Sequence, residues 1–91
     1  MYSDEIIEQI KQHAGLLLAP DQIALLLDLD LNQFKKDLRN LKSPVSIAYN
    51  KGKLDIIVEI RIQEINLAKL GSPMAVEQVA YFMLQQKLGE K

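Results

Sequence analysis

The three prolines of this 91-residue chain constrain its fold more than any other feature, because each stands at the start of a stretch with helical character. Proline fixes φ and lacks a backbone N–H, so it is favoured in the first turn of a helix and breaks the helix interior. Ser43-Pro44 and Ser72-Pro73 also place a serine N-cap directly before the proline. With Ala19-Pro20, these dipeptides predict helices that begin near residues 20, 44 and 73.

Two further helix starts carry an N-cap without proline. Ser3 precedes two acids, which would meet the positive end of a helix dipole, and this first helix is expected to end near Gly15. Asp28 can enter the left-handed backbone region at tolerable cost and would end the second helix. Asp30, with Gln33 three residues later, has the pattern of a capping box that starts the next one. The sequence therefore predicts an all-α fold of about five helices.

Apolar residues recur at helical spacing along these segments and are expected to form a thin core. A chain of this length buries only about two-thirds of its unfolded surface. The predicted core residues are Ile6, Ile7, Ile10, Ala14, Ile23, Ala24, Leu26, Leu27, Leu31, Phe34, Leu38 and Leu41, with Met74 and Met83 as core filler in the C-terminal part.

Residues 45–62 allow two interpretations. The end of this segment nearly alternates and is rich in β-branched residues, and Asn50-Lys51-Gly52-Lys53 resembles a hairpin turn, which together would give a winged helix-turn-helix. Against a hairpin, the residues that follow are strongly helical up to Gly71, and no Gly or Pro separates them from the supposed strand. We favour one helix from Pro44 to Leu70 and keep the hairpin at 45–62 as the alternative.

Wound as a helix, this segment has two apolar flanks beside a polar stripe that contains Asp55 and Glu59. One flank holds Ile56, Ile60 and Leu67. Ninety-one residues cannot easily cover both flanks, so we expect a second subunit on one of them. The expected organisation is a single helical domain over 1–91, with a helix-turn-helix part in 1–43 and a helical oligomerisation part in 44–91.

Composition excludes several kinds of site. The chain has no cysteine and one histidine, so disulfides, thiolate metal sites and cysteine nucleophiles are absent, and we expect no metal site and no cofactor. An acidic N-terminus and short apolar runs argue against a signal peptide or a membrane span, and so favour a cytoplasmic protein. Charge is unevenly placed, because residues 35–53 hold six basic side chains and one acidic one.

A short helix, a tight turn and a second helix with an exposed basic face form the helix-turn-helix arrangement, whose second helix enters the DNA major groove. Arg39 suits guanine, and Asn32 or Gln33 suits adenine, although Gln33 is also expected in the capping box; lysines suit phosphates. The alternative interpretation is that the same lysines lie on a solvated helix face and bind no ligand. The predicted contacts to double-stranded DNA come from Asn32, Lys35, Lys36, Arg39, Asn40, Lys42, Lys51 and Lys53.

The strings PDQIALLLDLDLNQFKKDL and SPVSIAYNKGKLDIIVEIRIQEINLAKLGSPMAVEQVAYFM resemble small phage and prophage helix-turn-helix proteins related to the terminase small subunit. The resemblance implies a DNA-binding motif followed by an oligomerisation segment, in a homo-oligomer that recognises viral DNA and passes it to a large terminase-type ATPase subunit. It assigns the subunit contacts to Ile56, Ile60, Leu67 and Val76.

Two other classes of function compete with DNA binding. The first is a helical protein–protein interaction or adaptor module, in which the apolar flanks bind a partner and the basic helix has no ligand. The second is a small enzyme, which we do not expect, because no nucleophile, base and acid are assembled at any recognisable spacing. Asp55 and Glu59, four residues apart, have no third ligand near them, and His13 has no carboxylate partner at helical spacing.

Overall fold

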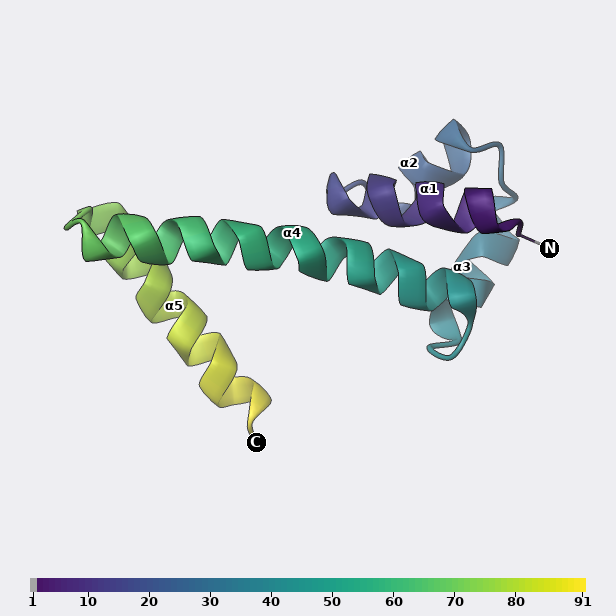
Figure 1. The fold of residues 1–91 in the computed structure, drawn as a ribbon. Coiled ribbons are helices and arrows are strands. Elements are labelled where there is room, and N and C mark those ends of the chain that lie inside the picture. The colour runs from purple at the N-terminus through teal and green to yellow at the C-terminus, as the bar shows by residue number, and fades with distance from the viewer. Residues whose placement is uncertain (1) are drawn as a thin grey trace. The chain divides into compact units, whose positions relative to one another are not determined.

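The computed structural model describes residues 2–91 of the chain, and within them it contains only helices and the loops that join them (Figure 1). The five helices are α1 (Asp4–Gly15), α2 (Pro20–Leu26), α3 (Leu31–Arg39), α4 (Pro44–Lys69) and α5 (Pro73–Gly89). The predicted all-α fold is confirmed. The alternative hairpin at 45–62 is wrong, because α4 runs through the whole segment without a break.

The helix starts follow the predicted capping chemistry. Each proline is the first residue of its helix. The Oγ of Ser3 accepts a hydrogen bond from the N–H of Ile6 at 3.1 Å, and the carboxylate of Asp30 accepts one from the N–H of Gln33 at 2.9 Å. These bonds satisfy amides that have no partner inside the helix. The side chain of Gln33 turns to Asp37 instead of back to Asp30, so only half of the predicted capping box forms there.

Three helices end in the same way, with one residue in the left-handed backbone region. These residues are Leu17 (φ 62°) after α1, Asp28 (φ 54°) after α2 and Gly71 (φ 94°) after α4. The next N–H then donates back to the last turn, at 2.8 Å from Leu29 to the carbonyl of Ala24. Asp28 and Gly71 were predicted as helix ends. At α1 the left-handed residue is Leu17 and not Gly15, which is the last helical residue.

The chain divides into two compact units, and the division lies inside α4, between Ile56 and Ile57. Residues 44–56, about three and a half turns of α4, belong with the N-terminal helices because they supply core residues to them. The helix-turn-helix part was expected to end at residue 43, so the N-terminal unit is one helical segment longer than the expected part. The buried apolar core of this unit consists of Ile10, Ala14, Ile23, Ala24, Phe34 and Val45.

Two leucines predicted for this core are instead exposed. Leu26 is 59% exposed because α2 turns Ile23 and Ala24 inward, which places Leu26 about 110° from the centre of the buried face. Leu41 is 74% exposed because α3 ends at Arg39, so its helical spacing no longer applies two residues later.

The C-terminal unit consists of the second half of α4 and of α5, which turns back after Gly71. Among its residues only Ala75 is fully buried. Met74 and Met83 were predicted as core filler and are 82% and 63% exposed, because two helices alone enclose no interior for them. The N-terminal unit therefore has a core of its own, whereas the C-terminal unit is nearly all surface.

Candidate nucleic-acid interface

The α3 helix is held from below by apolar side chains. Phe34 is completely buried, and Leu31 and Leu38 pack against the same core. Ala24 of α2 is buried in this core, and Leu29 packs against it from the turn between the two helices. This arrangement fixes which side of α3 faces solvent.

Four polar side chains occupy the opposite side of α3. With about 100° between successive residues of a helix, Asn32, Lys35, Lys36 and Arg39 fall within an arc of about 100°. All four are exposed. The structure thus groups the predicted contacts of α3 on one face, with three positive charges over two turns.

The other edge of α3 carries a hydrogen-bonded carboxylate. The hydroxyl of Tyr2 donates to one oxygen of Asp37 at 2.6 Å, and the amide of Gln33 donates to the other oxygen at 3.0 Å. Burial of the tyrosine ring, followed by this hydrogen bond and by the negative charge of Asp37, raises the pKa of Tyr2 from its ordinary 10.0 to about 12. The charge of Asp37 is therefore directed away from the basic face.

A cleft of about 830 Å³ lies on this acidic edge of α3. Its lining includes four carboxylates, which come from the N-terminal segment, from the turn before α3 and from α3 itself. They are Asp4, Asp28, Asp30 and Asp37. The helix therefore separates a basic face from an acidic cleft, and only the basic face suits a polyanion.

The loop after α3 supplies two more of the predicted contacts. Asn40 caps the C-terminal end of α3, and its side-chain oxygen accepts a hydrogen bond from the N–H of Lys42 at 3.2 Å. Both residues are exposed. Ser43 fixes the end of this loop, because its Oγ donates to the carbonyl of Asp37 at 2.8 Å and accepts from the N–H of Ser46 at 3.1 Å. Lys42 thus extends the positive charge at the C-terminal end of α3.

The two predicted lysines of α4 differ in position. The Oγ of Ser46 donates to the carbonyl of Leu38 at 3.0 Å, which marks the side of α4 that contacts α3. Lys53 lies seven residues later on this side, and its ammonium group is 5.1 Å from the centre of the Tyr49 ring. Lys51 lies five residues later, which places it about 140° around the helix. The fold therefore brings Lys53, and not Lys51, to the side of α4 that contacts α3.

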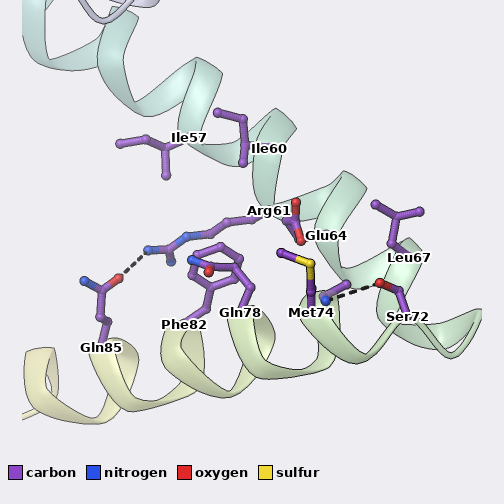
Figure 2. A pocket seen from close by; sticks show the side chains of 11 residues that line it. Ile57, Ile60, Arg61, Glu64, Leu67, Ser72, Met74, Gln78, Phe82 and Gln85 are labelled. Atoms are coloured by element: carbon purple, nitrogen blue, oxygen red, sulfur yellow. Dashed lines mark hydrogen bonds between the residues drawn. The ribbon is translucent and has the colours of Figure 1, made fainter.

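The residues assigned to subunit contacts fall in two places, one on α4 and one on α5. Ile60 and Leu67 line a groove of about 560 Å³ between the second half of α4 and α5, together with Met74 (Figure 2). Ile56 lies one turn before Ile60 on the same side of the unbroken helix α4, and Val76 is half exposed on α5 outside this groove. The structure therefore places three of the four along one side of α4 and leaves Val76 apart from them.

Two contacts that sequence reasoning missed connect residues far apart in the chain. Arg61 stacks on the ring of Phe82, with 4.6 Å from its guanidinium carbon to the ring centre, and donates to Gln85 at 3.1 Å (Figure 2). The bond from Tyr2 to Asp37 spans 35 positions. Neither pair has a local sequence signal, because side chains this far apart meet only once the helices have packed.

Other kinds of site find little support in residues 2–91. No three His, Cys, Asp or Glu side chains of these residues are grouped so that they could hold a metal ion. None of the helices described combines the length and the apolar character needed to cross a bilayer. Asp55 and Glu59 are both exposed, and His13 is a partly buried residue of α1.

Comparison of the chain with protein-family models, with curated proteins and with solved structures finds no match in any of the three.

Proposed function

We propose that the protein is a cytoplasmic, non-enzymatic DNA-binding protein that presents α3 to the major groove as the second helix of a helix-turn-helix. One observation carries this proposal: the buried Phe34 holds α3 on its core so that Asn32, Lys35, Lys36 and Arg39 share a single exposed face. The turn of four residues between α2 and α3 has the length that such motifs use.

The residues of this face divide between two tasks. Lys35, Lys36 and Lys42 would bind phosphates, which supplies affinity without sequence preference. Arg39 offers the planar pair of donors that matches guanine, and Asn32 offers the donor and acceptor that match adenine. Lys53 would add a phosphate contact from α4 if the duplex extends beyond α3.

The acidic cleft restricts how α3 can lie on DNA. Asp30 sits at the N-terminal end of α3, and Asp37 points into the cleft on the other edge. Phosphates close to either carboxylate would be repelled. We therefore propose that the duplex approaches from the side of Lys35 and Arg39 and leaves the cleft in solvent.

The biological setting that we propose rests on the resemblance to terminase small subunits. In that setting the protein recognises phage DNA for packaging and delivers it to a large ATPase subunit. This setting is separable from DNA binding, because α3 would serve a regulator of a mobile element equally well.

Duplex binding of a double variant tests the role of α3. We expect Lys35→Ala with Arg39→Ala to weaken binding to a random-sequence duplex at least tenfold, measured by fluorescence anisotropy across a salt series. The slope of log K against log salt should fall by about 0.9 for each phosphate contact removed. Both side chains are exposed, so circular dichroism should show unchanged helix content.

The matched control removes the same charge elsewhere. Lys87→Ala with Lys91→Ala deletes two exposed positive charges near the end of α5 and should leave affinity and salt slope unchanged. Equal losses in both double variants would mean that binding follows net charge alone and would contradict the proposal. If the wild-type protein shows no salt-dependent duplex binding, the adaptor alternative takes its place.

A further inference from the structure

The end of α3 lacks the left-handed residue that follows α1, α2 and α4. Its C-cap, Asn40, has an extended backbone instead, with φ −84° and ψ 96°. The carbonyls of the last turn have no partner inside a helix, and a left-handed residue normally directs backbone N–H groups back to them. At α3 some of the donors must therefore come from elsewhere in the chain.

Two serines at the N-terminal end of α4 supply these donors. The Oγ of Ser43 donates to the carbonyl of Asp37 at 2.8 Å, and the Oγ of Ser46 donates to the carbonyl of Leu38 at 3.0 Å. The carbonyl of Leu38 has no partner within α3, because α3 ends one residue later. These two bonds link the last turn of α3 to the start of α4.

The hydroxyl of Ser46 is buried and makes hydrogen bonds on two sides. Among residues 2–91, Ser46 is the only buried residue with a polar side chain. The Nδ2 of Asn50 donates to the carbonyl of Ser46 at 2.9 Å and to its Oγ at 3.2 Å. A buried hydroxyl is unfavourable unless it is hydrogen-bonded, and alanine would favour the helix more at nearly the same size. What the hydroxyl contributes at this position is the bond to α3.

This bond fixes the part of α3 that carries Arg39. Arg39 is the last residue of α3 and directly follows Leu38, whose carbonyl accepts from Ser46. A guanidinium that pairs with guanine through two bonds needs a fixed backbone, because a planar bidentate contact depends on orientation. A lysine acts on a phosphate as a point charge and tolerates displacement. Lys35 and Lys36 lie earlier in α3, so loosening of its last residues displaces Arg39 more than the lysines.

We infer that Ser46 is a positioning residue for sequence recognition, which holds the last turn of α3 so that Arg39 can pair with one guanine. This role rests on the proposed function of α3, and it concerns the preference among sequences, whereas the lysines supply overall affinity. Ser43 supports the same turn but also accepts from the N–H of Ser46, so its loss would disturb the start of α4 as well. Ser46 is therefore the residue that separates the two effects.

Binding to defined duplexes tests the role of Ser46. The probe is the duplex that the wild-type protein enriches from a randomised library, together with duplexes that each carry one changed base pair. Arg39→Ala identifies the guanine that Arg39 contacts, because the wild-type preference for that base pair, about tenfold or more, should disappear. Ser46→Ala should lower the preference at the same base pair by a factor of about three or more, and should leave the other positions and the salt slope unchanged.

Ser72→Ala is the matched control. It removes a serine hydroxyl that caps α5 in the C-terminal unit, and it should leave the preference at every base pair unchanged. Circular dichroism should show the wild-type helix content for both serine variants. If Ser46→Ala does not fold, Asn50→Ala decides, because it removes an exposed side chain that orients the Ser46 hydroxyl. Asn50→Ala should fold and lose a smaller part of the same preference.

Two results with Ser46→Ala would overturn its role: an equal loss of affinity for all duplexes, or a wild-type preference at the base pair that Arg39 contacts. A wild-type preference in Asn50→Ala would do so where Ser46→Ala is unfolded. Wild-type protein that binds duplexes without any sequence preference would also overturn it. Each of these results leaves salt-dependent duplex binding by α3 in place, whereas a wild-type protein that binds no duplex removes the proposed function itself.

Discussion

Single residues in the left-handed backbone region set three of the helix ends, and they differ in how well they suit it. Gly71 adopts this region freely, and Asp28 is among the few other residues that enter it at moderate cost. Leu17 has neither advantage. Its side chain is more than half exposed, so its packing does little to offset the strain of the backbone. Leu17 is thus the least favourable of the three left-handed residues that end helices.

Leu17→Gly is therefore expected to stabilise the protein by about 0.5–1 kcal/mol. A left-handed non-glycine residue costs about 1–2 kcal/mol, and glycine loses about 0.5–1 kcal/mol more backbone entropy on folding. Asp28→Gly is the matched control and should change the free energy of unfolding by less. Urea denaturation of the two variants measures both values, and a Leu17→Gly protein less stable than the wild type would contradict the expectation.

Tyr2 makes the free energy of unfolding depend on pH in the alkaline range. Its pKa is about 12 in the folded state and 10.0 when unperturbed, so between these values the folded state keeps a proton that the unfolded state has lost. The contribution is complete below pH 10 and is lost as the pH rises towards 12. Ultraviolet titration of the tyrosines should show one group that ionises late.

Tyr2→Phe should remove that late-ionising group, so the free energy of unfolding should fall less at alkaline pH than it does in the wild type. Urea unfolding at several pH values measures this. Burial also raises the pKa of Tyr49, so a smaller loss in the same direction should persist in the variant. Asp37→Asn should lower the pKa of Tyr2 towards its ordinary value, since it removes the negative charge beside the hydroxyl. A Tyr2 titration that stays unchanged in Asp37→Asn would contradict the contact.

At the scale of helices, the contact between α1 and α4 depends on one residue without a side chain. A Cβ at Gly52 would lie 2.1 Å from the carbonyl oxygen of Lys11 and 3.2 Å from the Cβ of Ala14. The first of these atoms belongs to a helix backbone and cannot rotate away. The sequence suggested Gly52 as part of a hairpin turn, whereas the structure uses it for close packing of two helices.

Gly52→Ala should destabilise the protein by about 1–3 kcal/mol, the usual range for overpacking, because α1 must move away from α4. Alanine has the higher helix propensity, so any loss measures the contact and not the helix. Gly89→Ala is the control: its Cβ would meet open space near the end of α5, and stability should stay equal or rise slightly. Thermal unfolding of both variants followed by circular dichroism makes the comparison, and a stabilised Gly52→Ala protein would refute the close packing.

At the scale of the whole molecule, the two compact units differ in how much of their apolar surface they bury. The N-terminal unit has a buried core and presents the basic face of α3, whereas the C-terminal unit has almost no core and leaves most of its large apolar side chains exposed. A short basic helix on a chain of net charge −1 should bind DNA weakly by itself. The homo-oligomer that the resemblance implies would place several copies of α3 in one particle and raise affinity by avidity.

Local signals in the sequence are enough to place the start of each helix and the end of most of them. Caps, prolines and left-handed residues act within one helical turn. The N-caps Ser3, Asp30 and Ser72 can therefore be recognised without knowledge of the fold. The sequence also indicates the exposed face of α3, because helical spacing places the lysines on the side opposite Phe34.

Which apolar faces are covered, and which polar groups meet, depends instead on how the helices pack. Four apolar residues of the kinds that usually form cores are exposed, because burial depends on the elements that pack nearby and not on the local pattern. They are Leu26, Leu41, Met74 and Met83. The contacts from Tyr2 to Asp37 and from Arg61 to Gln85 join positions 35 and 24 residues apart. Such contacts depend on how whole helices approach one another, and no short stretch of sequence encodes that.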